Sequence, residues 1–218
     1  MRGSESGGYV FLSPHPDDIA LSLGSICGNA ELRARLVTVF SRTDWLGPDE
    51  ARDEELATKI RQAEDAEFAR LFSLEHVDLG FADFPLRTGL PVETCCSSPT
   101  DATAAVLTAL LQLPWRSGST MLAPAGTGGH VDHLACHDAA VAFGRRTGMP
   151  VLFYSDMPYA IRPGAVVDPA RSFVAGDGES WFRAVKCYPS QSRLLRETVH
   201  LAGPDGAPVI GAYLSPRP

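Results

Sequence analysis

The sequence predicts an α/β fold with three layers, in which helices cover both faces of a mostly parallel sheet. Short, uninterrupted apolar runs alternate along the chain with longer stretches of helical periodicity, and strands covered on both faces have this continuous apolar character. The chain has 218 residues, of which 44% are hydrophobic, and this size suits one core. We therefore expect a single domain over residues 1–218, with residues 1–8 flexible.

Five apolar runs mark the strands of the sheet, beginning with YVFL near the N-terminus. The predicted strands are residues 9–12, 36–40, 76–79, 120–123 and 151–154. Between them lie segments of helical periodicity, so successive strands should run parallel. This alternation is typical of a Rossmann-like fold.

Six helices are expected from spacing of about 3.6 residues between apolar positions. They are residues 18 to about 32, 49–72, 102–113, the stretch after GGHVDH to about 146, 178–187 and 189–199. In the second of these, Leu56, Ile60, Ala63 and Phe68 are predicted to share the buried face. Residues 80–100, rich in Gly, Pro, Ser and Thr, are predicted to be a loop.

The composition favours a small-molecule partner. Acidic residues outnumber basic ones 26 to 19, giving a formal net charge of −7, whereas a nucleic-acid surface needs clustered Lys and Arg. No apolar run approaches the roughly 18 residues of a membrane span. The five cysteines form no CxxC pattern and do not suggest a disulfide framework, so we expect a cytoplasmic protein. Homo-oligomerisation stays open.

Two stretches rich in acids and histidine each follow a predicted strand. PHPDD at 14–18 follows the first strand, and GGHVDH at 128–133 follows the fourth. Ligands of parallel sheets bind at the carboxyl ends of the strands. We therefore expect the two stretches to form one site, although more than a hundred residues separate them.

The pattern of residue types suggests a metal site. His15 and Asp18 lie three residues apart at a helix start, so their side chains can converge. With His133 they give two imidazoles and one carboxylate, a set that suits Zn²⁺ and leaves one position for water. Another divalent cation stays open.

The remaining polar residues of the two stretches suggest hydrolysis of an amide. Asp17 is the candidate general base for the metal-bound water. His130, as an imidazolium, is expected to stabilise the oxyanion and then to protonate the departing amine. Asp132 is expected to orient His130 or to lie in the second shell of the metal.

The paired motifs resemble the PIG-L/LmbE-like family of zinc-dependent N-acetyl-sugar deacetylases. Four further segments support the resemblance: RQAED at 61–65, LGFADFPLR at 79–87, YSDMPYA at 154–160 and KCYPSQ at 186–191. The resemblance implies a hydrolase that removes an acetyl or related acyl group from an amino-sugar, such as an N-acetylglucosaminyl conjugate. It also implies zinc on the three ligands named above, with Asp17 as the base.

The same resemblance suggests residues for the substrate side. Arg61 and Asp83 would bind sugar hydroxyls, although an ion pair with Glu64 or Asp65 on the same helix is the alternative for Arg61. Asp156 and Gln191 are further candidates to face the substrate, with a cap or a helix surface as the alternative. One departure is local: Gly128 stands where some relatives carry a tyrosine.

Two other functions compete with this one. A nucleotide- or S-adenosylmethionine-binding transferase is suggested by LGSICGNA after the first strand, but its glycines do not follow GxGxxG and lie within a predicted helix. A sugar-binding relative without catalysis is the third reading, and the presence of Asp17 beside the metal ligands argues against it.

Overall fold

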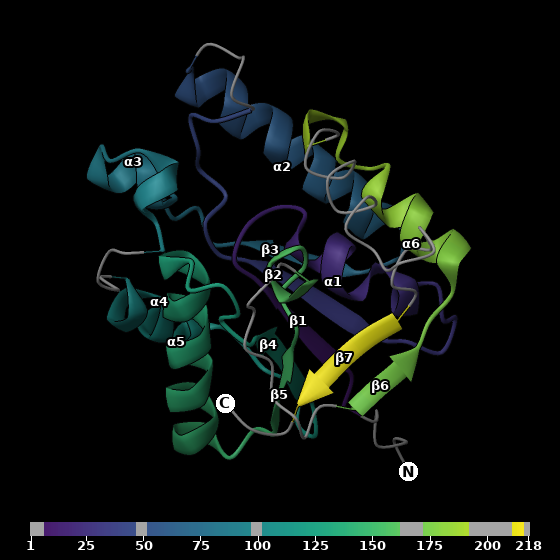
Figure 1. Ribbon diagram of the computed structural model, residues 1–218. Coiled ribbons are helices and arrows are strands. Elements are labelled where there is room, and N and C mark those ends of the chain that lie inside the picture. Colours follow the sequence, from purple (N-terminus) through teal and green to yellow (C-terminus); the bar gives the residue numbers. More distant parts are fainter. Residues whose placement is uncertain (1–6, 47–51, 97–101, 162–171, 192–210, 216–218) are drawn as a thin grey trace.

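The computed structural model describes residues 7–46, 52–96, 102–161, 172–191 and 211–215. Its centre is a sheet of seven strands in the order β3-β2-β1-β4-β5-β7-β6 (Figure 1). The first five strands in this order pair in parallel, and β7 pairs antiparallel with both β5 and β6. The predicted α/β fold with a mostly parallel sheet is thus confirmed.

The five predicted strands all form, within two residues of their expected bounds. They are β1 (Tyr9–Ser13), β2 (Ala34–Thr38), β3 (Glu75–Asp78), β4 (Thr120–Pro124) and β5 (Val151–Tyr154). The sequence analysis missed β6 (Ser172–Ala175) and β7 (Gly211–Ser215). These two strands extend the sheet at the β5 edge.

The main helices also form where periodicity places them; four have shorter bounds than predicted, and α5 begins earlier, within GGHVDH. They are α1 (Asp18–Cys27), α2 (Glu54–Leu71), α4 (Thr103–Gln112), α5 (Val131–Thr147) and α6 (Gly178–Val185). Helix α1 ends earlier than expected because Gly28 follows it and the Asn29 side chain then accepts a turn hydrogen bond from Glu31 N. Of the helix predicted at 189–199, the structure describes only the 3₁₀ turn η3 (Pro189–Gln191). The rest lies outside the described residues.

The loop predicted at 80–100 contains a short helix. Helix α3 (Phe84–Thr88) starts where the Asp83 side chain accepts from Leu86 N, and Pro85 lies in its first turn. The 3₁₀ turn η1 (Val92–Thr94) follows it. Another, η2 (Tyr159–Ile161), comes after β5. A capping Asp and an early Pro are favourable at a helix start, and they outweigh the loop-like composition here.

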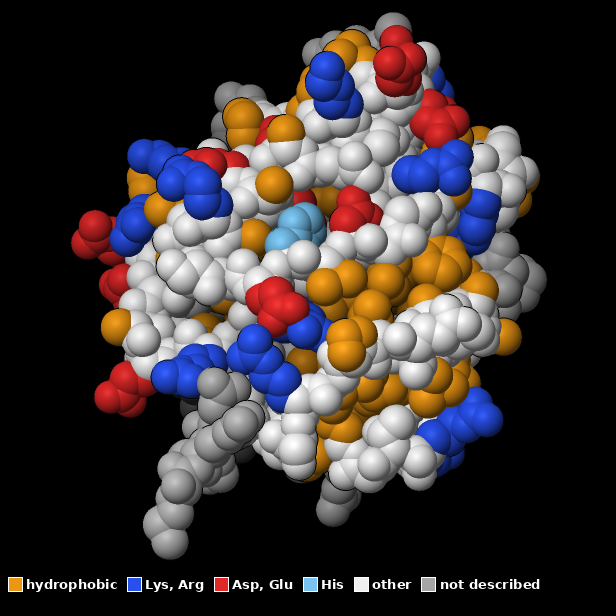
Figure 2. Space-filling view, turned by 180° about the vertical axis from the view of Figure 1, so that it is seen from behind, with side chains coloured by type: hydrophobic (Ala, Val, Ile, Leu, Met, Phe, Trp, Pro, Cys, Tyr) orange, Lys and Arg blue, Asp and Glu red, His pale blue; other side chains and the backbone are white. Residues whose placement is uncertain are grey.

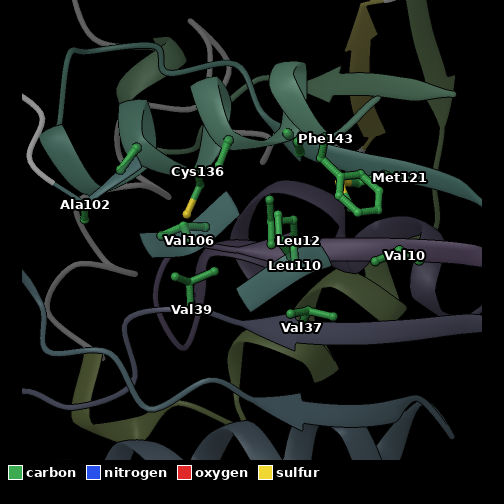
Figure 3. Packing of buried hydrophobic residues seen from close by; sticks show 14 of the residues in the cluster. Val10, Leu12, Val37, Val39, Ala102, Val106, Leu110, Met121, Cys136 and Phe143 are labelled. Carbon is green, nitrogen blue, oxygen red and sulfur yellow. The ribbon is translucent and has the colours of Figure 1, made fainter. Parts of the chain in front are cut away.

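Alternate residues of the strands supply two separate cores, one on each face of the sheet. Val10 and Leu12 of β1 face α4 and α5, where Val106 and Phe143 are fully buried (Figure 3). Phe11, between them, points to the opposite face and packs in a second cluster with residues of α1, α2 and α6. This arrangement gives the three predicted layers.

The buried face of α2 differs from the prediction. Leu56 is 51% exposed, and Ala63 is also exposed. Phe68 is buried as predicted, and Ile60 is half-buried. Besides Phe68, the helix buries Ala57, Ala69 and a polar stripe formed by Arg61, Glu64 and Asp65. The prediction ranked positions by apolarity, whereas these charged side chains have partners on neighbouring segments that compensate their burial.

The described helices include none with the length and apolar character that crossing a bilayer needs.

On the face seen in Figure 2, Lys and Arg side chains are interspersed with Asp and Glu side chains rather than gathered into one basic patch. Glu75 on β3 pairs with both Arg35 and Arg116.

Candidate active site

The two predicted motifs meet at the carboxyl ends of β1 and β4, which are neighbours in the sheet. His15 Nδ1 lies 3.2 Å from Asp18 Oδ2, and His133 Nε2 lies 3.4 Å from the same oxygen. The three residues can each offer one ligand atom within 4.8 Å of the others. The prediction that the motifs converge is therefore supported by the geometry.

The loop between β1 and α1 turns the two adjacent aspartates in different directions. Asp17 has a φ of 98°, in the left-handed region that residues other than Gly rarely adopt. Arg61 holds this conformation, because its Nη2 donates to Pro16 O at 2.5 Å and to Asp17 Oδ1 at 3.1 Å. Asp18 turns back to accept from His15 N at 2.8 Å. Arg61 thus pairs with the motif rather than with Glu64 or Asp65.

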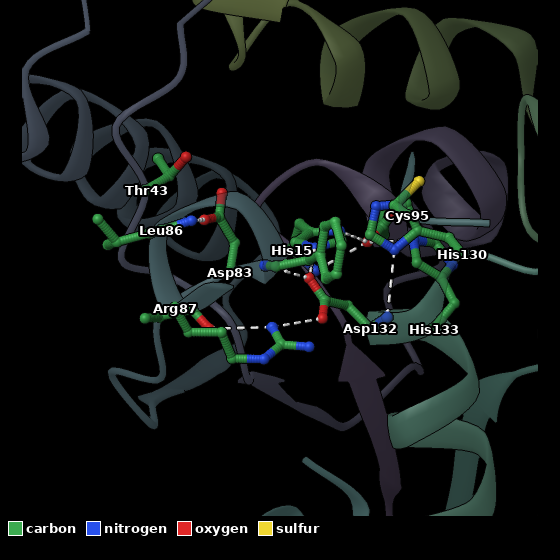
Figure 4. A network of polar contacts seen from close by, with 12 residues as sticks. His15, Thr43, Asp83, Leu86, Arg87, Cys95, His130, Asp132 and His133 are labelled. Atoms are coloured by element: carbon green, nitrogen blue, oxygen red, sulfur yellow. Dashed lines mark hydrogen bonds and ion pairs between the residues drawn. The ribbon is translucent and has the colours of Figure 1, made fainter. Parts of the chain in front are cut away.

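Each imidazole of the cluster is fixed from behind by a buried carboxylate. His15 Nε2 lies 2.9 Å from Asp132 Oδ2 (Figure 4), and His133 Nδ1 lies 2.6 Å from Asp156 Oδ1. Metal-binding histidines characteristically direct their second nitrogen to such a group. Asp156 is fully buried and also accepts from Thr127 N.

One buried atom of this cluster has no hydrogen-bond partner among the described residues. It is His133 Nε2, the nitrogen that points toward Asp18. A buried nitrogen left unpaired is costly, and a cation held with His15 and Asp18 would satisfy it. The residues present therefore fit a divalent metal ion.

A second group, formed by His15, His130 and Asp132, is also compact enough for a metal ion. Its carboxylate is already engaged. Asp132 Oδ1 pairs with Arg87 at 2.7 Å, and Oδ2 accepts from Phe84 N at 2.9 Å besides contacting His15. A cation there would have to displace these partners, so the first group suits a metal better.

Burial and close contacts between opposite charges shift the pKa values of the cluster. Burial alone would lower the pKa of His15, but its hydrogen bonds with Asp132 and Asp18 raise it to about 10. Burial would raise the pKa of Asp18, but the charge of His133 and the hydrogen bond from His15 lower it to about 2. Burial would likewise raise the pKa of Asp132, but the His15 hydrogen bond and the charge of Arg87 hold it below its usual range.

Asp17 behaves differently from its neighbour. Its burial raises the pKa to about 7, although the charge of Arg61 opposes the shift, and the charge of Asp18 adds to it. A carboxyl group that titrates near neutral pH is suited to exchange a proton during a reaction.

His130 is the N-cap of α5, and its Nδ1 accepts from Asp132 N at 3.2 Å. The proton of the neutral ring therefore lies on Nε2. Burial, together with the charges of His15 and His133, lowers the pKa of His130 to about 3. The free protein thus favours a neutral ring and not the expected imidazolium. The backbone of Asp132, and not its carboxylate, orients this ring.

A pocket of about 160 Å³ opens over these residues. Three of the four substrate-side candidates line it, namely Arg61, Asp83 and Gln191. Asp83 also caps α3. Asp156 does not line the pocket, because it is fully buried behind His133. The prediction that Asp156 faces the substrate is corrected to a role in holding His133.

The sequence analysis did not single out Tyr159, which also lines the pocket. Its ring stands edge-on to His133, with centroids 5.3 Å apart. A Cβ at Gly128 would lie 2.7 Å from the Cβ of Tyr159. The tyrosine from YSDMPYA therefore occupies the space that Gly128 leaves. Trp45, which lines the pocket, was missed because nothing in its local pattern distinguishes it from a surface residue. Arg87, which pairs with Asp132, was not singled out within LGFADFPLR.

Comparison with known proteins identifies similar chains. The model of the PIG-L family, described as GlcNAc-PI de-N-acetylase, matches residues 10–143. The 2'-N-acetylparomamine deacetylase of Streptomyces fradiae is 40% identical over 169 residues, which are 73% of this chain and 60% of that protein. The chain thus spans about three-fifths of the length of this relative.

Two solved structures have the same fold. A deacetylase in complex with teicoplanin, from the biosynthesis pathway of teicoplanin, is 21% identical with a TM-score of 0.70, over 94% of this chain and 96% of that one. A zinc-inhibited form of teicoplanin deacetylase is 19% identical with a TM-score of 0.67, over the same shares. At these identities the likeness establishes the fold alone.

Proposed function

We propose that this chain, which belongs to the PIG-L family, is a metal-dependent deacetylase that removes an acetyl group from an N-acetylated amino-sugar conjugate. The observation that carries the proposal is the cluster of His15, Asp18 and His133, in which a buried carboxylate holds the second nitrogen of each imidazole. Next to this cluster lies Asp17, whose burial raises the pKa of its carboxyl group to about 7.

His15, Asp18 and His133 would hold the cation, and Zn²⁺ is the proposed metal because two imidazoles and one carboxylate suit it. When bound, a divalent cation polarises a carbonyl group and makes a water molecule more acidic. Zinc is also the ion named for a solved structure of this fold, the zinc-inhibited form of a teicoplanin deacetylase.

Asp17 is the proposed general base. Its Oδ1 is held by Arg61, which leaves Oδ2 to take a proton from the water that attacks the acetyl carbonyl carbon. His130 would donate a hydrogen bond from Nε2–H to the oxyanion that forms on the carbonyl oxygen. When the C–N bond breaks, the proton held by Asp17 can pass to the departing amine. The products are acetate and the free amino-sugar.

For the substrate, we propose an N-acetylated aminoglycoside or a similar small glycoside. The 40% identity to the 2'-N-acetylparomamine deacetylase supports this class, and so does a pocket that combines apolar walls with a few polar groups. Arg61, Asp83 and Gln191 line the walls and would bind the sugar. We further propose a cytoplasmic location, because the five cysteines are free and thiols stay reduced there.

The test is an amine-release assay over N-acetylated glycosides, including 2'-N-acetylparomamine, with metal-depleted and zinc-reloaded protein. We expect no amine release without metal, recovery at about one zinc per chain, and loss of metal binding in Asp18→Ala. A metal-depleted protein with full activity, or a zinc-loaded protein inactive across the panel, would refute the proposal.

The alternative of a nucleotide- or S-adenosylmethionine-binding transferase gains no support from the fold. The glycine of LGSICGNA in the middle of α1, Gly24, packs against Ala184 and Trp181 of α6 rather than facing a pocket. A Cβ there would meet Ala184 at 2.7 Å. This glycine serves the close approach of two helices.

A further inference from the structure

The buried polar stripe of α2 contacts two segments that each contribute a residue to the pocket lining. Arg61 reaches the loop that carries Asp17, as described above. Glu64, nearly one turn further along, reaches another segment, KCYPSQ. One rigid helix thus connects the proposed base with the segment that ends at Gln191.

Glu64 uses both carboxylate oxygens on one residue of that segment. Oε1 accepts from Ser190 N at 2.7 Å, and Oε2 accepts from Ser190 Oγ at 2.6 Å. The Ser190 hydroxyl in turn accepts from Gln191 Nε2 at 3.1 Å. Glu64 is only 7% exposed, and bonds to a buried charged acceptor are among the stronger ones.

Asp65, the next residue of α2, anchors the start of the same segment. Its Oδ1 accepts from Tyr188 OH at 2.7 Å, and its Oδ2 accepts from Thr38 Oγ1 at 2.5 Å. The backbone of residues 188–191 is therefore fixed at two points on the helix. Gln191 is 2% exposed and lies in the pocket wall with Arg61 and Asp17.

Among the described residues, these contacts engage the amide nitrogen of Gln191 and leave its amide oxygen for a substrate donor. We propose that Glu64 is a positioning residue that acts through Ser190 to set the Gln191 carboxamide against a hydroxyl or ammonium group of the sugar. The inference rests on the proposed function and deepens it, since it assigns specificity for the sugar to a helix outside the metal cluster.

A positioning role of this kind affects substrate binding rather than the chemical step. We expect Glu64→Ala and Gln191→Ala each to raise KM about tenfold, the factor that corresponds to roughly 1.4 kcal/mol and to one hydrogen bond. The kcat and the zinc content should stay within twofold of the wild type. Glu64→Gln keeps one acceptor oxygen for Ser190 N and should show an intermediate KM.

The double variant Glu64→Ala/Gln191→Ala is the sharpest part of the test. If Glu64 acts through Gln191, the KM of the double variant will be no higher than the KM of Gln191→Ala alone, because the effects of residues that act through one another are not additive. Glu67→Ala is the matched control. Glu67 lies on the same helix but is exposed and pairs only with Arg70 in the described structure, so its KM should be unchanged.

The inference would be overturned if the KM of the double variant equalled the product of the two single effects. It would also be overturned if Glu64→Ala lowered the melting temperature but left KM unchanged. Either result would leave the proposed function intact. A wild type without turnover would overturn the proposed function instead. A crystal structure of Glu64→Ala tests the positioning role directly. A displaced Ser190–Gln191 turn supports the inference, and an unmoved turn overturns it.

Discussion

The contact between Asp156 and His133 offers a sharp test of the proposed metal site. We predict that Asp156→Asn weakens zinc binding without unfolding the protein. In the wild type, Asp156 Oδ2 accepts from Thr127 N at 3.0 Å while Oδ1 contacts His133 Nδ1 at 2.6 Å. An asparagine must direct its oxygen to the Thr127 N–H, so its NH₂ group faces His133.

That orientation reverses the tautomer of His133. The ring must accept at Nδ1, and the proton of the neutral ring then lies on Nε2, the nitrogen that faces Asp18. A protonated Nε2 cannot bind a metal. Loss of such a supporting group typically costs about 10–100-fold in metal affinity, which is about 1.4–2.8 kcal/mol. Because both side chains are at most 1% exposed, solvent cannot replace the lost contact.

Zinc affinity can be measured by competition with a chromogenic chelator. Asp138→Asn is the matched control, since Asp138 is an exposed residue of α5 and its replacement removes the same charge. The control should bind zinc like the wild type. If Asp156→Asn also bound zinc within twofold of the wild type, the proposed support of His133 by Asp156 would be wrong.

Three further predictions follow from the same geometry. Asp17→Asn should keep its zinc but lose about 10²–10⁴-fold in kcat, the usual contribution of a general base; loss of zinc in this variant, by metal analysis, would make Asp17 a ligand instead. The raised His15 pKa of about 10 keeps this ring protonated in the metal-free chain at neutral pH, so zinc must displace its proton, and zinc affinity should rise about tenfold per pH unit from pH 7 to 9; a flat profile in calorimetry would contradict this. Gly128→Ala should raise KM and lower the melting temperature, because Gly128 has a φ of +88° and the new Cβ would lie 2.7 Å from Tyr159; an unchanged KM would show that Tyr159 does not shape the pocket.

The strands, the main helices and the meeting of the two motifs were predictable because they follow from short-range patterns and one rule of topology. Continuous apolar runs predicted β1 to β5, and the shared edge of parallel strands predicted that His15 and His133 would meet. Neither inference needs the direction of an individual side chain.

The structure differed from the prediction where burial depends on distant partners. The polar face of α2 is buried because Glu64 and Asp65 find donors more than a hundred residues away, in KCYPSQ. Asp156 was a candidate to face the substrate because YSDMPYA resembles a substrate-side segment of the family, but its side chain turns behind His133. Periodicity and composition carry no information about such pairings.

The most direct test is an anomalous diffraction map at the zinc edge from crystals of the zinc-loaded protein. We predict one peak bounded by His15 Nδ1, Asp18 Oδ2 and His133 Nε2, at about 2.0–2.2 Å from each, with the Asp17 carboxylate beyond bonding distance. A peak between His15, His130 and Asp132, or one bonded to Asp17, would contradict the proposed separation of metal ligand and base.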